Sequence, residues 1–185
     1  DAWEGDAGGT LPALLRKLGL PCGAAPAEYP DGTAAELFRD AGVLELNRGC
    51  PFSCTYCASR LLCPSFAPGD PQKALRYFTM LYEAGVRNFA FYDDALLFRK
   101  KDVLFPFLRE VAAGGFNARF YTPNAVHLKY IDGETAELMR RAGFTEVRLG
   151  FESAEEGFHR SYDSKFDLKG FSARIAELRG AGFPA

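Results

Sequence analysis

The sequence has no long hydrophobic run. None of its apolar stretches approaches the roughly 20 residues that a membrane-spanning helix needs, and no charged-then-apolar signal segment stands near its start. An excess of one charge is lacking as well, because the formal net charge of the 185 residues is −2. A basic surface for nucleic acid or for an anionic membrane is therefore not indicated. With 48% hydrophobic and 25% charged residues, the composition is ordinary for a soluble globular protein.

Histidine is scarce, and cysteine is unevenly distributed. His127 and His159 are the only histidines, and their positions do not match a metal-ligand spacing, so we expect both to be loop or surface residues. The five cysteines are an odd number, and three of them crowd into eight residues, whereas a secreted disulfide scaffold usually spreads an even number along a shorter chain. This distribution predicts a cytoplasmic protein with a metal site.

One pattern occurs four times: a helix-like segment reaches a glycine and continues with a large apolar residue. These glycines are Gly85, Gly114-Gly115, Gly143 and Gly182. Glycine at this point suits the left-handed residue that closes a helix. Asp70, followed by Pro71, predicts the start of a helix that runs to Ala84. Asp132 or Thr135 could likewise start the helix that leads to Gly143.

Short apolar or aromatic runs follow the first three glycines, and an earlier run precedes the cysteines. These runs, at residues 43–46, 88–92, 118–121 and 146–151, predict four strands. Their alternation with helices indicates βαβ units and a parallel sheet, wound into a barrel or a doubly wound sheet. Residues 1–40, rich in Ala, Gly and Pro, are interpreted as a linker or the end of an upstream domain. We expect a fragment, because the sequence has no initial Met and stops after the fourth glycine.

Polar residues stand where each predicted strand ends. They occupy positions 47–49, 93–94, 122–124 and 152–153. Ligands of α/β folds bind at the carboxyl ends of parallel strands, which meet at one edge of the sheet. We therefore expect the binding site there.

The loop at residues 50–57 has the pattern Cys-x3-Cys-x2-Cys, formed by Cys50, Cys54 and Cys57. Thiolates are soft ligands that suit iron–sulfur clusters and zinc. Three ligands for a four-iron cluster leave one iron open to bind and activate another molecule. The alternatives are a structural zinc site or a closed cluster that recruits Cys63 as a fourth ligand, a disulfide, or buried unligated thiols.

Residues 49–57, which follow a predicted strand, resemble the cluster loop of the radical S-adenosylmethionine (SAM) superfamily, and the resemblance extends from about residue 43 to residue 185. It implies an α/β fold, a partial (β/α)6 TIM-like barrel of which about four β/α units are present, truncated before the fifth strand. Residues 41–185 would form the N-terminal two-thirds of this domain. In the family the three cysteines hold a 4Fe–4S cluster, and the methionine part of SAM chelates the fourth iron.

The same resemblance implies roles for further residues. Tyr56, just before the third cysteine, would pack near the adenine of SAM. Asp93 and Asp94, similar to a paired-aspartate variant of cobalamin-associated members, would contact the amino group. Glu152 and Ser153 would face the ribose and carboxylate, and Lys165 would pair with the carboxylate. The alternatives are helix capping for the aspartates and for Ser153, and an ordinary solvated lysine.

The implied function is that of a radical enzyme. A reduced cluster would cleave SAM to methionine and a 5′-deoxyadenosyl radical, which would remove hydrogen from a small-molecule or metabolite substrate. A reductant such as flavodoxin or ferredoxin is implied as a partner. The aspartate pair and the linker-like start leave open an upstream cobalamin-binding domain, with methyl transfer or a rearrangement as the final reaction. The sequence identifies neither the substrate nor a catalytic residue. The alternatives are an iron–sulfur electron carrier and a zinc-stabilised binding module with Cys63 as the fourth ligand.

Overall fold

The computed structural model describes residues 40–163 and 168–184. The expected linker before residue 40, Cys22 within it, and the candidate Lys165 lie outside the described residues. In the part of the chain that is described, no helix is long and apolar enough to cross a membrane.

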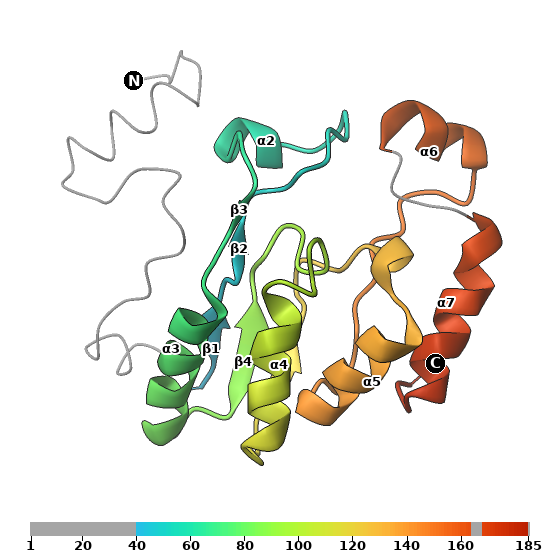
Figure 1. The fold of residues 1–185 in the computed structure, drawn as a ribbon. Helices are drawn as coiled ribbons and strands as arrows, with labels where there is room; N and C mark the ends of the chain where they lie inside the picture. Colours follow the sequence, from blue (N-terminus) through green and yellow to red (C-terminus); the bar gives the residue numbers. More distant parts are fainter. Residues whose placement is uncertain (1–39, 164–167, 185) are drawn as a thin grey trace, which may run out of the picture.

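The centre of the fold is a three-stranded parallel sheet. Its strands are β1 (Gly42–Leu44), β4 (Asn88–Phe91) and β5 (Arg119–Tyr121), in the order β1-β4-β5. Leu44 pairs with Phe91, and Phe89 pairs with Phe120. The parallel sheet predicted from the alternation of helices and strands is therefore confirmed, and these strands lie within or close to three of the predicted runs (Figure 1).

The fourth predicted strand, 146–151, is not a regular strand. Two isolated parallel bridges join this part of the chain to the neighbouring segment, Phe120 with Phe144 and Val126 with Leu149. Pro123 has no backbone N–H to donate, and Ala125 adopts a left-handed φ of 52°, so the neighbouring segment is interrupted between the two bridges. The fourth unit thus lies beside β5 without a continuous ladder.

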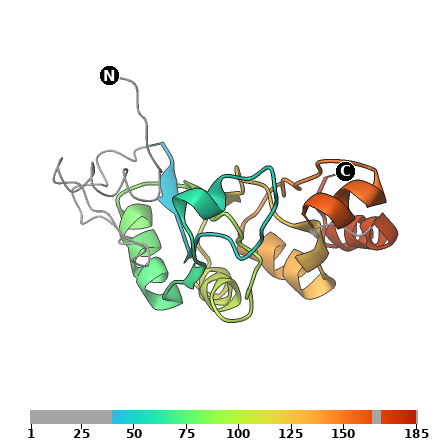
Figure 2. The same ribbon diagram turned by 90° about the horizontal axis from the view of Figure 1, so that it is seen from above.

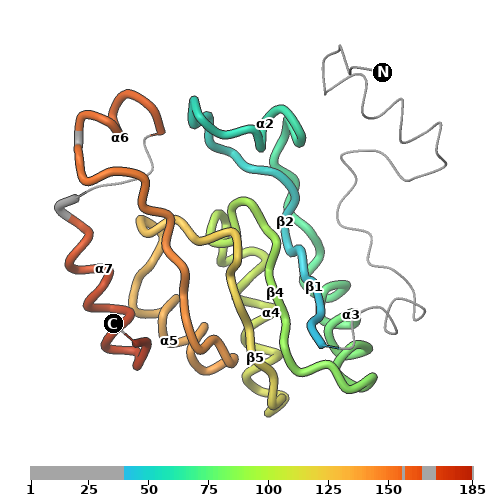
Figure 3. Tube along the Cα trace, turned by 180° about the vertical axis from the view of Figure 1, so that it is seen from behind, coloured from blue at the N-terminus to red at the C-terminus, as the bar shows by residue number. Residues whose placement is uncertain are grey.

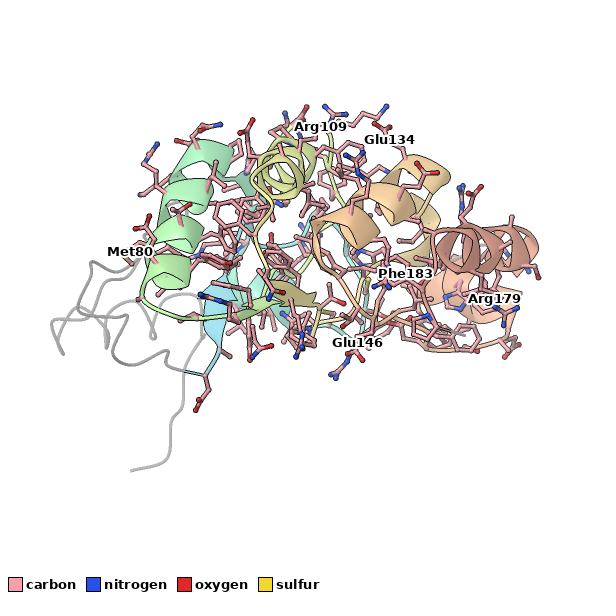
Figure 4. All side chains as sticks on the ribbon, turned by 90° about the horizontal axis from the view of Figure 1, so that it is seen from below. Met80, Arg109, Glu134, Glu146, Arg179 and Phe183 are labelled. Atoms are coloured by element: carbon pink, nitrogen blue, oxygen red, sulfur yellow. The ribbon has the colours of Figure 1, made fainter. Side chains whose placement is uncertain are left out.

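Helices cover one face of the sheet, the face turned toward the viewer in Figure 1 and away from the viewer in Figure 3. Neighbouring helices pack in the order α3 (Pro71–Glu83), α4 (Leu104–Ala113), α5 (Gly133–Ala142) and α7 (Leu168–Gly180). On their outer side, Arg109 of α4 and Glu134 of α5 form an ion pair of 3.1 Å beside an open groove of about 400 Å³ (Figure 4). This groove contains none of the candidate site residues.

The predicted helix boundaries agree with the structure. The Asp70 side chain accepts a hydrogen bond from the Gln72 amide at the start of α3, and Asp132 accepts one from the Thr135 amide at the start of α5. The glycines after the four predicted helices all have positive φ, as the repeated pattern predicts; these are Gly85, Gly115, Gly143 and Gly182. At Gly143 a side chain is also excluded by space, because a Cβ would lie 2.3 Å from the Ala118 carbonyl oxygen.

The core between the helices and the sheet is aromatic. Phe120 of β5 is fully buried, and its ring lies 5.4 to 6.2 Å from those of five other phenylalanines. Those residues are Phe78, Phe89, Phe91, Phe107 and Phe144. Because they come from α3, β4, α4 and the bridged fourth segment, this cluster holds the β/α units together.

A second, two-stranded ladder was not predicted. β2 (Asn47–Arg48) pairs antiparallel with β3 (Ala67–Pro68), and the Gly69 amide donates to the Leu46 carbonyl oxygen at 2.9 Å. The chain between these strands contains the cysteine loop and the short helix α2 (Ser59–Leu62). The ladder therefore closes the base of an excursion that lies beyond the end of the parallel sheet (Figures 1 and 2).

Candidate functional site

The cysteine loop begins at a turn that only glycine fits. Gly49 has a φ of +76°, and a Cβ there would lie 2.5 Å from the Ser65 carbonyl oxygen and 3.0 Å from the Cys63 sulfur. The chain that leaves β2 and the chain that returns to β3 thus contact each other at Gly49, directly before Cys50. The loop follows β1 and β2, so it starts at the carboxyl end of the parallel sheet, where the sequence predicts a ligand site.

The three cysteines differ in exposure. Cys50 and Cys54 are buried, Cys57 is exposed, and none of the three forms a disulfide with another described cysteine. The Cys57 amide donates to the Cys54 carbonyl oxygen at 3.1 Å, and the Cys57 sulfur lies 3.2 Å from the Ser59 hydroxyl. Burial raises the pKa of the Cys50 thiol, and the charge of Asp94 raises it further. A bound cation would favour the thiolate instead, as metal ligation does for thiols in general.

The three thiols form a donor set that is compatible with an iron–sulfur cluster. Among the described residues, no three His, Cys, Asp or Glu side chains converge on a point where one metal ion could bind. In an iron–sulfur cluster each thiolate binds a different iron, so the sulfurs need not converge. Cys63, the fourth ligand of the alternative closed site, lies on the chain that returns to β3, and its sulfur is 3.7 Å from the Ser65 carbonyl oxygen. The residues present are thus compatible with a cluster held by three cysteines.

Phe52 anchors the first half of the loop. Its ring packs edge-on against His127 with 4.7 Å between ring centroids, and it also contacts Tyr130 of the 3-10 helix η2 (Leu128–Tyr130) at 6.1 Å. The Lys129 ammonium lies 4.3 Å from the centroid of the Phe52 ring. His127 is therefore a loop residue, as predicted, and it supports the cysteine loop.

Tyr56 anchors the second half of the loop to the opposite side of the site. Its hydroxyl donates to Asp163 at 2.6 Å, and its ring stacks on Phe158 of α6 (Glu156–Tyr162) at 5.9 Å. Burial and the bond to Asp163 raise the pKa of the Tyr56 hydroxyl, which therefore remains a donor at neutral pH. The Thr55 amide adds a bond of 3.0 Å to the Tyr162 carbonyl oxygen.

Asp93, at the end of β4, is buried and faces the backbone before the loop. Its carboxylate accepts hydrogen bonds from the Leu46 amide at 3.0 Å, the Asn47 amide at 2.6 Å and the Asn47 side chain at 3.2 Å. Burial raises the pKa of Asp93 to about 7, although these hydrogen bonds oppose the shift. The carboxylate thus ties the end of β4 to the junction of β1 and β2.

Asp94 is exposed, and its charge acts on the thiols of Cys50 and Cys63. Neither Asp93 nor Asp94 caps a described helix, because the residue before α4 is Val103. The capping alternative for the aspartates is therefore wrong. Their contacts with SAM stay a prediction, for which Asp94 is the better placed of the two because Asp93 already accepts three hydrogen bonds.

Glu152 and Ser153 lie between the bridged fourth segment and α6. Glu152 is exposed, and its charge acts on Tyr56 and His159. The Ser153 hydroxyl accepts a hydrogen bond of 3.0 Å from the Glu155 amide, which forms a local turn before the helix. The structure therefore brings Tyr56 and Glu152 to one region, whereas the Ser153 hydroxyl already has a partner.

The surface assignment of His159 is wrong. Its side chain is 2% exposed, lies 3.0 Å from Asp163 and makes a bond of 2.7 Å to the Ser153 carbonyl oxygen. The sequence signal that could have revealed this pair is the i,i+4 spacing of His159 and Asp163 at the end of a helix. Asp163 itself was not among the predicted site residues.

A comparison with protein families decides the identity of the fold. Residues 44–185 match the model of the Radical SAM superfamily. The chain belongs to the radical SAM superfamily. Among curated proteins, it is 29% identical over 115 residues to a protein of Pyrococcus horikoshii described as an uncharacterized methyltransferase; the match covers 61% of this chain and 24% of that protein.

Known structures with the same fold include two cobalamin-related members of this superfamily. The methyltransferase TsrM from Kitasatospora setae, solved with tryptophan and a SAM analogue, superimposes with a TM-score of 0.69 at 14% identity, covering 86% of this chain and 32% of its own. OxsB, solved with aqua-cobalamin and SAM, gives a TM-score of 0.63 at 16% identity, covering 82% and 24%. The chain thus spans only about a quarter to a third of the length of these relatives.

Proposed function

We propose that Cys50, Cys54 and Cys57 hold a 4Fe–4S cluster and that the chain forms part of the catalytic domain of a SAM-cleaving enzyme. The observation that carries the proposal is the three-cysteine loop at the carboxyl end of the parallel sheet, in a chain of the radical SAM superfamily. When bound, such a cluster supplies the electron that cleaves SAM to methionine and a 5′-deoxyadenosyl radical. The protein supplies ligands, orientation and exclusion of water.

Each candidate side chain has a task that its position supports. Cys50 and Cys54 would hold the buried side of the cluster and Cys57 its exposed side. With only three cysteine ligands, one iron stays open for the methionine part of SAM. The exposed carboxylate of Asp94, close enough to act on Cys50, would accept hydrogen bonds from the SAM ammonium group. Asp93 would fix the base of the loop from inside.

The opposite side of the site would hold the rest of SAM. Tyr56, a residue that is 46% exposed, would pack its ring near the adenine. Glu152, whose charge acts on Tyr56, would accept hydrogen bonds from the ribose hydroxyls. Ser153 and Lys165 stay candidates for the carboxylate of SAM. The Ser153 hydroxyl oxygen accepts a bond from the Glu155 amide, and its own O–H would donate to the carboxylate of SAM.

Cobalamin-dependent methyl transfer is the reaction class that we propose for the whole protein. The relative from Pyrococcus horikoshii is described as a methyltransferase, TsrM is a radical SAM methyltransferase, and OxsB is cobalamin-dependent. Cobalamin would be bound by a domain upstream of residue 41. A reductant protein and a small-molecule substrate complete the proposed set of partners.

Anaerobic reconstitution of the chain with iron and sulfide tests the proposal and its alternatives. We expect about four irons per chain, absorption near 400 nm typical of an iron–sulfur cluster, and release of methionine from SAM after reduction. Cys57→Ser should lose the cluster, whereas Cys63→Ser, the matched control, should keep it. Loss of iron in the Cys63 variant would favour the closed electron-carrier site. Binding of one zinc in place of iron would favour the binding module.

A further inference from the structure

We infer that His159 and Asp163 are positioning residues: together they link the Ser153 carbonyl to the Tyr56 hydroxyl and so hold the cysteine loop against α6. The inference deepens the proposed function, because Tyr56 and the segment at 152–153 are the parts of the cofactor site that these two residues connect. Figure 1 shows the loop before α2 reaching toward α6 across the end of the sheet.

The pair is fully enclosed. The side chains of His159 and Asp163 are 2% and 0% exposed, respectively, and they lie four residues apart at the end of α6. The Nδ1 atom of His159 is 3.0 Å from one carboxylate oxygen of Asp163 and 3.1 Å from the other. The second of these oxygens also accepts the Tyr56 hydroxyl at 2.6 Å. Burial of a carboxylate costs free energy unless the carboxylate is paired, and here both His159 and Tyr56 contact it.

The hydrogen-bond partners fix the charge of the histidine. The Nε2 atom of His159 lies 2.7 Å from the Ser153 carbonyl oxygen, which can only accept. Nδ1 lies between two oxygens of a carboxylate that also accepts from Tyr56. A neutral imidazole has a single N–H, so with Asp163 ionised both bonds can form only if His159 carries two protons and a positive charge.

The electrostatic surroundings agree with a charged His159. Burial lowers its pKa, but the bond to the Ser153 carbonyl and the contact with Asp163 raise it by more, so the net pKa of His159 is raised. The ionisable groups that face it are Asp163 on its own element, Glu152 on the preceding segment and, through Asp163, the Tyr56 hydroxyl of the loop. Both carboxylates favour the imidazolium form.

The consequence for the site is mechanical. Tyr56 and Asp163 are 107 positions apart in the sequence, and the same two segments are joined again by the Thr55–Tyr162 backbone bond and the stacking of Tyr56 on Phe158. A change in the His159–Asp163 pair therefore reaches the Tyr56 ring directly. Cys54 and Cys57 flank Thr55 and Tyr56 in the loop. The His159–Asp163 pair therefore sets where these cluster ligands and the proposed adenine contact lie relative to Glu152.

Nitrogen NMR of the chain labelled with ¹⁵N-histidine tests the charge without any cofactor. The sequence has only two histidines, and His159→Gln identifies the signals of His159 by their loss. We expect both ring nitrogens of His159 to be protonated at pH 6 and to titrate above the ordinary value near 6.5. In Asp163→Asn the titration should move below that value. Tyr56→Phe, the matched control, should keep the imidazolium. A neutral His159 at pH 6 in the wild type would overturn the inference.

Hydrogen exchange tests the positioning itself. The Thr55 amide is bonded to α6, so its exchange reports the attachment of the loop. Asp163→Asn and His159→Gln should each speed it at least about tenfold, the effect of losing a charge-assisted hydrogen bond, while amides of α3, far from the pair, stay protected. Unchanged Thr55 exchange in both variants would refute the positioning role. Neither measurement needs iron, so failure to bind a cluster would be recognised separately.

Discussion

The pH dependence of stability should reveal the buried carboxylate of Asp93. Burial raises its pKa from 3.8 to about 7 in the folded chain, while the unfolded chain keeps the ordinary value. The folded state therefore binds more protons between about pH 4 and pH 7, and the free energy of unfolding falls as the pH rises through this window. The two pKa values predict that the free energy of unfolding falls by about 3 kcal/mol from pH 5 to pH 8, because the folded and unfolded chains differ in bound protons over about two pH units of this range.

Asp93→Asn removes this titration. The amide cannot ionise, so the difference in unfolding free energy between wild type and variant should change by about 3 kcal/mol, in favour of the variant, from pH 5 to pH 8. Urea unfolding of the reduced, cluster-free chain, followed by circular dichroism at each pH, measures it. Asp94→Asn removes the neighbouring exposed carboxylate, leaves the buried one in place and serves as the matched control. Parallel curves for wild type and Asp93→Asn would refute the reasoning.

Four further substitutions test the loop with its control, a partly buried cation and the core. Gly49→Ala should abolish cluster reconstitution, because its Cβ would lie 2.5 Å from a backbone oxygen. Gly85→Ala is the matched control, since Gly85 also has a positive φ but has space for a Cβ. This control should lower stability by about 1 to 2 kcal/mol and still bind iron. The Lys100 ammonium donates to the Asp132 carboxylate and to the Tyr130 carbonyl oxygen, each at 2.6 Å. Lys100→Met should therefore cost about 2 kcal/mol in urea unfolding and raise the pKa of Asp132 from about 2. The stability that the wild type loses only as the pH falls from about 4 toward 2 would then already be missing at neutral pH. Phe120→Ala should cost about 3 to 5 kcal/mol, and a loss below 1 kcal/mol would contradict its place in the core.

The helices and their ends could be predicted because their signals are local. Asp70 and Asp132 are N-caps whose bonds reach only two or three residues along the chain, and the positive φ of Gly143 reflects a conformation that glycine alone adopts at no cost. The three regular strands follow from short apolar runs. The cysteine loop is recognisable for the same reason, since its ligands are close in sequence.

The remaining features depend on contacts between distant segments. The apolar run at 146–151 predicts a strand, but the partner segment is interrupted around Pro123, so a regular ladder does not form. The burial of Asp93 depends on amides 46 and 47 positions away. His159 is polar and lies on a short helix, and only the packing of the loop against that helix buries it. Apart from the i,i+4 spacing of His159 and Asp163, composition and spacing carry no information about such pairings.

We propose that the cluster on Cys50, Cys54 and Cys57 has an open iron that binds SAM. Electron–nuclear double resonance of the reduced cluster with SAM labelled with ¹⁵N at its amino group tests this binding most directly. We expect a resolved ¹⁵N coupling in the wild type and in Cys63→Ser. A reconstituted, reduced cluster that shows no coupling and an unchanged spectrum with excess SAM would contradict the claim.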